Sequence, residues 1–415
     1  MKIWNEGKMK NFADVKGGKR LPKGKQLTKQ PNSHPYIRIK NLGKSKVLEL
    51  NSEYEYVDDE THKSIARYTV DSGDILISVV GTIGLIAIVG ESLDKANQTE
   101  NCDKIVNIKD LDRDYLYYYL TSSIGQEEIR KGIVGAVQPK LPLKNVQDIT
   151  VKYPTLKMQK KIVSILNIID KKIFVNDEIN RNLSEQAQAV FKEWFVDNPE
   201  SAKWKQGTFS DLVISTLGGD WGKEEKEGNY TEQVYCVRGA DIPEVKEGNK
   251  GKMPTRFILP KNYAAKQLVA GDIVVEISGG SPTQSTGRVA SISQSLLDRY
   301  DKGMVCTNFC RAIKPKDGYS MFIYYYWQYL YERGIFFLYE NGTTGIKNLD
   351  IKGFLENEEI IIPPKDLVDK FDALCQTIFN EIFKNGISTE KLAETRDTLL
   401  PRLMSGKLDV SELEL

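Results

Sequence analysis

The chain has 415 residues, of which 40% are hydrophobic and 28% are charged, and its formal net charge at pH 7 is +1. This length suggests two or three domains, and the composition is that of an average globular protein, which excludes collagen-like, mucin-like and wholly disordered proteins. The longest apolar stretch, Ile75 to Val89, is interrupted by polar residues and is shorter than the roughly 20 residues of a membrane-spanning helix. The first residues lack the apolar core of a signal peptide, so we expect a cytoplasmic protein without a membrane partner.

Cysteine and histidine are scarce. The five cysteines include no CxxC pair, so neither a disulfide framework nor a zinc cage is predicted. Cys306 and Cys310 are the one close pair, and buried strand residues are favoured over metal ligands there. The chain has only two histidines, His34 and His62, so the sequence gives little support to acid–base catalysis by histidine.

The stretch between Val15 and Leu48 contains ten lysines and arginines and not one aspartate or glutamate. Glycines and a proline between residues 17 and 24 predict a loop for its first part. Cations without anions create a field that attracts polyanions, so a nucleic-acid contact is favoured over a basic loop with no partner. The expected phosphate contacts of this loop are Lys16, Lys19, Arg20, Lys23 and Lys25.

The chain repeats itself. Four segments recur in the same order: residues 35–42 in 234–242, 70–81 in 269–280, 115–120 in 322–327, and 135–154 in 342–364. Four ordered matches indicate two copies of one unit of about 200 residues. The third match contains Tyr117 to Tyr119 and Tyr324 to Tyr326, for which packing in the core is favoured over stacking on bases.

Each copy has a front part and a back part. The front part, about 150 residues, has short β-branched runs separated by Gly, Pro, Asn and Asp, which is typical of a mixed α/β domain. After Pro154 and Pro364, apolar residues recur every three, four or seven positions, which predicts a long helix with a heptad-like seam in each copy. Asn176 and Asn385 occupy equivalent seam positions, where buried polar groups could fix the register. We expect Gly386 to loosen the second helix and Pro401 to end or kink it.

The predicted fold class is therefore α+β, with two globular mixed α/β domains held apart by two long antiparallel helices that form a coiled coil with a pseudo-two-fold internal repeat. The expected boundaries are 1–153 and 198–362 for the domains, 154–197 and 363–405 for the helices, and 406–415 for a C-terminal tail. A helix from about Leu156 to Phe195 would span roughly 60 Å, so the helix pair would act as a ruler between two heads.

Several motifs carry a resemblance to a known family. They are GDILIS at 73–78, LKNVQDITVKYPTLKMQKKIVSIL at 143–166, FKEWFVDN at 191–198 and LLPRLMSGKLDV at 399–410. The full chain resembles the specificity subunit of type I restriction-modification systems. The resemblance implies two target-recognition domains, each contacting one half of a split asymmetric site in double-stranded DNA, with helices that set the gap.

The resemblance also implies partners. The helices would dock methyltransferase (modification) subunits, two of them being expected, and restriction subunits would join that core. Methylation, its AdoMet cofactor and ATP-driven cleavage would belong to these partners, so no cofactor is expected on this chain. We expect the docking surface on the outer face of the helix pair and on exposed aromatic residues at Trp194 and Phe195.

The residues themselves agree with a non-catalytic role. The chain lacks the NPP[FY] tetrapeptide and the FxGxG loop that an adenine methyltransferase needs. Glu224-Glu225-Lys226 has the form of a nuclease E-x-K motif, but a solvated charge run is favoured. Two alternatives stay open, namely a two-headed adapter that binds protein partners and an unrecognised DNA-acting enzyme.

Sequence-specific recognition requires amide, hydroxyl or guanidinium groups on base edges, and such groups gather in glycine-punctuated loops of both copies. The candidates in the first copy, for contact with base edges or for positioning them, are Ser78, Thr82, Asn97, Gln138 and Lys140. Those in the second copy are Ser278, Ser281, Thr283, Gln284, Arg288, Asn308, Arg311, Thr343, Thr344 and Lys347. The second copy has no acid-free stretch, so we expect two different half-sites.

Overall fold

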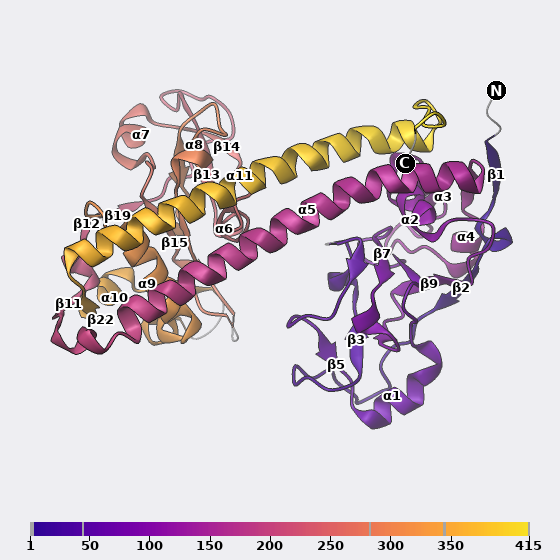
Figure 1. Ribbon diagram of the computed structural model, residues 1–415, viewed down its shortest axis with the longest axis horizontal. Helices are drawn as coiled ribbons and strands as arrows, with labels where there is room; N and C mark the ends of the chain where they lie inside the picture. Colours follow the sequence, from indigo (N-terminus) through magenta and orange to yellow (C-terminus); the bar gives the residue numbers. More distant parts are fainter. Residues whose placement is uncertain (1–3, 44, 282–283, 343–345, 414–415) are drawn as a thin grey trace. The chain divides into compact units, whose positions relative to one another are not determined.

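The computed structural model describes residues 4–43, 45–281, 284–342 and 346–413. Contacts divide the chain into two compact units, unit 1 with Met1–Lys171 and Ala393–Leu415, and unit 2 with Lys172–Leu392. Each of the two long helices therefore has one end in unit 1 and the other in unit 2 (Figure 1).

Unit 1 is a mixed α/β domain. Its strands are β1 (Asn5–Lys8), β2 (Asp14–Gly17), β3 (Pro35–Ile37), β4 (Val47–Leu48), β5 (Glu55–Tyr56), β6 (Ile75–Ser78), β7 (Ile86–Val89), β8 (Asn97–Gln98), β9 (Cys102–Val106) and β10 (Thr150–Tyr153). Its short helices are α1 (Asp59–Ile65), α2 (Arg113–Thr121), α3 (Ser123–Lys131) and α4 (Leu143–Gln147). Within the described residues the sheets have the orders β2-β9-β6-β7-β4, β5-β3-β8 and β1-β10.

Unit 2 repeats this arrangement. Its strands are β11 (Lys205–Thr208), β12 (Val213–Gly218), β13 (Glu232–Val237), β14 (Thr255–Ile258), β15 (Ile273–Glu276), β16 (Ser278–Gly279), β17 (Val289–Ser291), β18 (Met304–Cys306), β19 (Cys310–Pro315), β20 (Glu340–Asn341), β21 (Lys347–Leu349) and β22 (Glu359–Ile362). Its short helices are α6 (Ile242–Lys246), α7 (Pro260–Lys266), α8 (Gln294–Leu297), α9 (Ser320–Glu332) and α10 (Ile351–Asn357).

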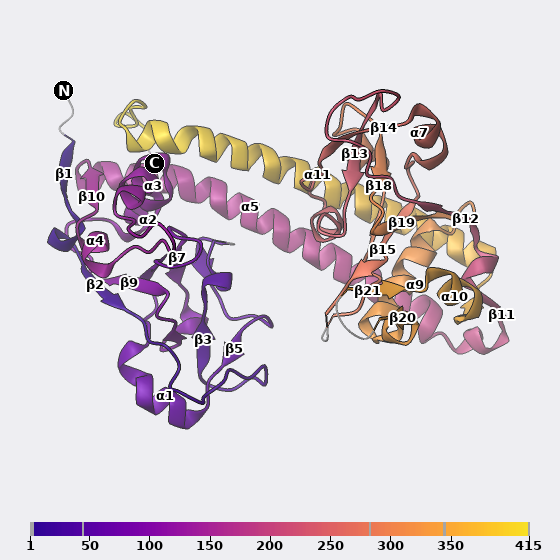
Figure 2. The ribbon, with the colours of Figure 1, turned by 180° about the vertical axis from the view of Figure 1, so that it is seen from behind.

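The strand orders of the two units correspond. The sheet β12-β19-β15-β17 matches β2-β9-β6-β7, and β14-β13-β18 matches β5-β3-β8 with the same antiparallel and parallel pairings. Figure 2 labels β2, β9 and β7 in unit 1 and β12, β19 and β15 in unit 2. The pairs β1-β10 and β11-β22 also correspond. The predicted fold class of repeated mixed α/β units with long helices is confirmed.

The long helices begin close to the predicted positions. Helix α5 spans Leu156–Phe191 and continues as a π-helical turn, Lys192–Val196, and α11 spans Lys365–Met404. In unit 1, Arg396 donates to Asp170 at 3.1 Å, and in unit 2, Asn176 donates to Thr389 at 3.3 Å. Residues of α5 thus meet residues of α11 in reversed order, as in an antiparallel pair.

Two features of α11 differ from what the sequence predicted for Gly386 and for the asparagines of the helix seam. The helix continues through Gly386 and ends three residues after Pro401, at Met404. A Cβ atom at Gly386 would lie 2.0 Å from the carbonyl oxygen of Gly248, so this glycine is explained by the close approach of another segment. Asn385 donates to Asn180 at 3.0 Å, so the polar contacts of the seam involve an asparagine that the sequence pattern did not single out.

The tyrosine clusters lie in the cores, as predicted. Tyr118 and Tyr119 on α2 are buried beside the ends of both long helices in unit 1, together with Leu166 and Leu403. Tyr324 and Tyr325 on α9 are buried in the core of unit 2 together with Phe191 and Phe371 of the long helices. Each globular domain therefore shares one apolar core with its part of the helix pair.

Candidate nucleic-acid interface

Three loops of unit 1 meet at Val79, the residue that follows β6. Its backbone N–H donates to the carbonyl of Asn101 in the turn between β8 and β9, at 2.8 Å. Its own carbonyl accepts from the N–H of Leu141, at the end of the glycine turn 133–141, at 2.9 Å. These hydrogen bonds bring together the loop 79–85, the turn 99–101 and the glycine turn.

Unit 2 builds the same junction at Ile277. The Ile277 N–H donates to the Phe309 carbonyl at 2.9 Å, and the Ile277 carbonyl accepts from the Leu349 N–H at 2.8 Å. Asn101 and Phe309 are therefore equivalent positions, and so are Leu141 and Leu349. The loops that contain most of the predicted DNA contacts are gathered in this way in each unit.

Two equivalent glycines, Gly18 in unit 1 and Gly219 in unit 2, allow a fourth segment to lie against the turn between the strands. A Cβ atom at Gly18 would lie 2.0 Å from the Thr99 carbonyl oxygen, and one at Gly219 would lie 1.9 Å from that of Thr307. No side chain fits in either place, so both copies need glycine where the strand β2 or β12 ends. The basic loop after Gly18 is thereby anchored beside the turn 99–101.

Half of the ten cations in the acid-free stretch are neutralised by carboxylates, which corrects the expected field of unpaired cations. Five of its cations pair with carboxylates from other segments: Arg20 with Glu100, Lys25 with Asp58 and Glu60, Arg38 and Lys40 with Glu55, and Lys46 with Asp114, at 2.5 to 3.2 Å. Although burial acts in the opposite direction, hydrogen bonds from Lys40 and Arg38 lower the pKa of Glu55.

The other described cations of the acid-free stretch are the better candidates for contact with phosphate. Among the described residues, Lys16, Lys23 and Lys29 are exposed and make no ion pair with a carboxylate. Lys19 is also exposed, with its ammonium 5.6 Å from the ring centroid of Tyr68.

Two of the predicted residues in unit 1, Ser78 and Asn97, are buried, which favours positioning of the loops over direct contact with a base edge. The Ser78 hydroxyl donates to the Thr82 carbonyl at 2.6 Å and accepts from the Leu85 N–H at 2.8 Å, so it shapes the loop 79–85. Asn97 is fully buried beside His62, 2.9 Å from its Nδ1. Thr82, Gln138 and Lys140 are exposed on the gathered loops.

Two predicted contacts of unit 2 are committed to internal ion pairs. Arg288 makes a bidentate pair with the buried Glu276, at 2.6 and 2.8 Å, and Lys347 pairs with Glu340 at 2.7 Å. Such buried pairs hold loops in place, and breaking them to contact DNA would be costly.

The other predicted contacts of unit 2 differ in exposure. Gln284 and Asn308 are exposed, whereas Ser278, Ser281 and Arg311 are half-buried. Thr283, Thr343 and Thr344 lie outside the described residues.

Large apolar side chains on these loops were not among the predicted contacts. Phe309 is 58% exposed although its carbonyl accepts two hydrogen bonds, from Ile277 at 2.9 Å and Ser278 at 3.3 Å. Val137 in the glycine turn and Ile346 are also exposed. A residue-by-residue alignment of the two copies would have placed Phe309 at the tip of a loop.

A second pair of equivalent positions lies two residues after Asn101 and Phe309, on strands β9 and β19. Asp103 pairs with Gly17 in the sheet of unit 1, and Arg311 pairs with Gly218 in the sheet of unit 2. Burial raises the pKa of the Asp103 carboxyl to about 7. At this position beside the gathered loops, unit 1 thus has a buried carboxyl and unit 2 has a half-buried guanidinium.

The expected aromatic docking pair is not exposed as predicted. Phe195 is buried, with ring centroids of Phe322 and Phe371 at 5.0 and 5.1 Å, and Trp194 is half-buried against the same core. The exposure predicted for Phe195 is therefore wrong, because its ring completes the core of unit 2. The exposed apolar side chains of α5 in this unit are Phe174, Val175 and Ile179.

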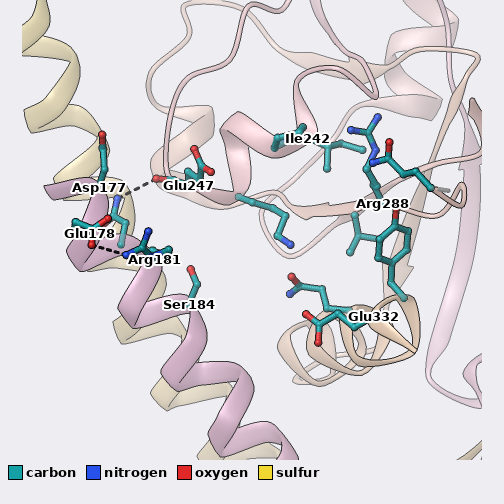
Figure 3. Close-up of a pocket in the computed structure, with 15 residues that line it drawn as sticks. Asp177, Glu178, Arg181, Ser184, Ile242, Glu247, Arg288 and Glu332 are labelled. Carbon is teal, nitrogen blue, oxygen red and sulfur yellow. Dashed lines mark hydrogen bonds and ion pairs between the residues drawn. The ribbon is translucent and has the colours of Figure 1, made fainter. Parts of the chain in front are cut away.

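Unit 2 also has a cavity of about 530 Å³ between α5 and the globular domain. Figure 3 shows Asp177, Glu178 and Arg181 of α5 on one side, with Arg288 and Glu332 across from them. Arg181 pairs with Glu178 at 2.5 Å, and burial raises the pKa of Asp177.

Within the described residues, no group of three or more His, Cys, Asp or Glu could hold a metal ion, and no helix is long and apolar enough to cross a membrane.

Comparisons with known proteins agree over nearly the whole chain. The family described as "Type I restriction modification DNA specificity domain" matches residues 1–185 and again 203–394. The chain is 25% identical over 430 residues to the type I restriction enzyme MjaIX specificity subunit of Methanocaldococcus jannaschii, covering 99% of this chain and 95% of that protein. It is 23% identical over 456 residues to the type I restriction enzyme HindI specificity subunit of Haemophilus influenzae, covering 91% and 95%.

A solved structure shares the fold. The crystal structure of the S subunit of a type I restriction-modification system from M. genitalium superposes with a TM-score of 0.52 and 16% sequence identity, covering 97% of this chain and 96% of that one. At this identity the likeness concerns the fold alone.

Proposed function

The chain belongs to the type I restriction modification DNA specificity domain family and is a specificity subunit of a type I restriction-modification system, and we propose that each of its two units recognises one half of a split, asymmetric DNA site. In such a system the specificity subunit is a non-catalytic part of the complex. The chain selects the DNA, and the reactions take place on other subunits.

The observation that carries the proposal is the repeated junction of loops with different side chains at equivalent positions. Asn101 corresponds to the exposed Phe309, and unit 2 has the half-buried Arg311 where unit 1 has the buried Asp103. Amide, guanidinium and apolar groups favour different base edges. Two units with one backbone arrangement and different side chains are suited to two different half-sites.

We place the target-recognition domains at residues 1–153 and 198–362, and the helices that set the gap at 154–197 and 363–405, followed by the tail 406–415. Phosphate contacts by the unpaired lysines of the first domain would supply affinity, and the loop side chains would supply specificity. The unequal charge of the two domains would place more of the phosphate affinity in the first.

The helices provide the proposed docking surface for two methyltransferase (modification) subunits, and the restriction subunits would join through that core. Phe174, Val175 and Ile179 support this assignment, because they are 62%, 41% and 42% exposed on one part of α5. Exposed apolar side chains gathered in this way are typical of protein–protein contacts. The AdoMet cofactor would then bind to the methyltransferase partners.

Long-read methylation sequencing of the host genome, with this gene intact and deleted, tests the proposal. We expect a split motif with a fixed unread gap that disappears on deletion. No change in methylation would contradict the proposal and favour the two-headed adapter. A salt titration separates the two functions. Binding to DNA by a specificity subunit should weaken steeply as the salt concentration rises, whereas an adapter should bind no DNA or bind it without dependence on salt.

A further inference from the structure

A buried polar junction ties the globular part of unit 2 to both long helices. Asn180 of α5, which is 3% exposed, donates through Nδ2 to the carbonyl of Glu247 at 3.0 Å and to that of Ile382 on α11 at 2.9 Å. Its Oδ1 accepts from Asn385 at 3.0 Å. One side chain thus links α5, α11 and the segment after α6, and Figure 3 shows the bond to Glu247 beside the cavity.

The segment after α6 also enters a notch in α11. The Gly248 carbonyl lies where a side chain at Gly386 would be, 2.0 Å from its Cβ position. Arg299 donates to this carbonyl at 2.7 Å and pairs with Glu390 of α11 at 2.7 Å, with its own side chain 8% exposed. The domain and the helix are therefore held at one point by a glycine notch, an ion pair and directional hydrogen bonds.

Unit 1 has a junction of its own with different residues. Lys46 of the globular part pairs with Asp114 of α2 at 2.8 Å and also bonds to Asn167 of α5. The Tyr118 hydroxyl lies 2.5 Å from Asp170 of α5, which accepts from Arg396 of α11 at 3.1 Å. Burial and the Asp170 carboxylate raise the pKa of Tyr118, so its hydroxyl keeps its proton.

Directional contacts of this kind fix the orientation of two packed elements more strictly than apolar packing does. An apolar surface tolerates small rotations, whereas a buried amide or ion pair without its partner carries the full desolvation cost. Single buried asparagines fix register in helix pairs for the same reason. A rotation of either globular part on its helices would separate the Glu247 carbonyl from Asn180 or the Tyr118 hydroxyl from Asp170, and would leave these buried polar groups short of a hydrogen-bond partner.

We propose that these two junctions fix the orientation of each target-recognition domain on the helices, and that they thereby restrict the complex to one gap between the half-sites. This inference rests on the proposed function. The junction residues are positioning residues that contact neither base nor phosphate. Helix length would set the approximate gap, and the junctions would exclude the neighbouring gaps.

The test compares Asn180→Ala with Asn182→Ala, a matched change at an exposed position of the same helix. Each variant replaces the gene in its host, and methylation is sequenced at the native half-sites separated by the native gap and by one base pair more or less. We expect Asn180→Ala to keep both half-sites while the ratio of native-gap to neighbouring-gap methylation falls at least tenfold. Asn182→Ala should behave as the parent chain does.

Unchanged gap selectivity in a folded Asn180→Ala complex would overturn the inference, and so would loss of the second half-site. If that variant does not accumulate, Arg299→Lys is measured in its place, because it keeps the charge opposite Glu390 while removing the guanidinium that reaches two partners. A parent chain that yields no split motif would instead overturn the proposed function, so the two failures are distinguishable.

Discussion

Asn101 and Phe309 occupy the same position in the two units, since the carbonyl of each accepts the backbone N–H that follows the equivalent strand, from Val79 at 2.8 Å and from Ile277 at 2.9 Å. The two turns therefore present different chemistry from one backbone frame. Asn101 offers an amide, and Phe309 offers an exposed ring next to Asn308.

We expect Phe309→Asn to change the methylated motif in one half only, with discrimination weakened by about 1–3 kcal/mol at one or two base pairs. Because the Phe309 side chain is 58% exposed, stability should change by less than about 0.5 kcal/mol. Methylation sequencing of the variant gives the result. Asn101→Phe should alter the other half, and a change of both halves by either variant would argue against separate recognition.

The unpaired lysines should carry phosphate contacts that the paired ones do not. For the double variant Lys16→Ala/Lys23→Ala, we expect weaker DNA binding at all sequences and a salt slope reduced by about 0.9 for each phosphate that is no longer neutralised. Lys25→Ala is the matched control from the same loop, because Lys25 pairs with Asp58 and Glu60. A salt titration of the assembled complex measures both, and an equal effect of Lys25→Ala would mean that its ion pairs open on DNA.

Asp103 predicts a pH dependence of stability. Burial raises the pKa of its carboxyl to about 7, from an ordinary value of 3.8, so between these values the unfolded chain loses a proton that the folded chain keeps. Its contribution to the free energy of unfolding is therefore largest below the ordinary pKa, falls as pH rises to about 7 and is constant above that.

Asp103→Asn removes this titration, so the stability of the variant relative to the parent should rise across that range by up to a few kcal/mol. Chemical unfolding at about pH 5 and about pH 8 measures the difference. A difference that does not depend on pH would mean that the carboxyl is solvated in solution.

The exposed side chains of α5 predict where the methyltransferase subunits dock. We expect Phe174→Glu to weaken binding of these subunits at least tenfold, because it places a charge in an apolar contact. The unfolding temperature should not change, since the ring is 62% exposed. Leu338→Glu, at an 80% exposed apolar position elsewhere in unit 2, is the control in co-purification. Equal effects of the two variants would place the docking surface elsewhere.

Local patterns predicted the helices and the repeat well. Prolines at 154 and 364 and the apolar periodicity after them placed the helix starts, which lie at Leu156 and Lys365. Strand runs and glycine turns also indicated the loops that gather at Val79 and Ile277. These features depend on neighbours in the sequence, so they can be seen without a structure.

Properties that depend on distant residues could not be predicted in this way. Glu55 and Glu100 neutralise the basic stretch from outside it, and Ser78 is buried under its own loop. The burial of Phe195 depends on Phe322 and Phe371, which lie more than a hundred residues later. Exposure and ion pairing are decided by tertiary contacts, so sequence patterns indicate loops more readily than the individual residues on them that are exposed and unpaired.

Separate recognition of the two half-sites by the two units is the feature of the proposed function that can be tested most directly. The most direct measurement exchanges residues 1–153 for the same region of another member of the family and sequences the methylated motif of the hybrid. We predict that one half of the motif changes, while the other half and the gap stay as they are. A change of both halves, or an unchanged motif, would show that the two units do not recognise separate half-sites.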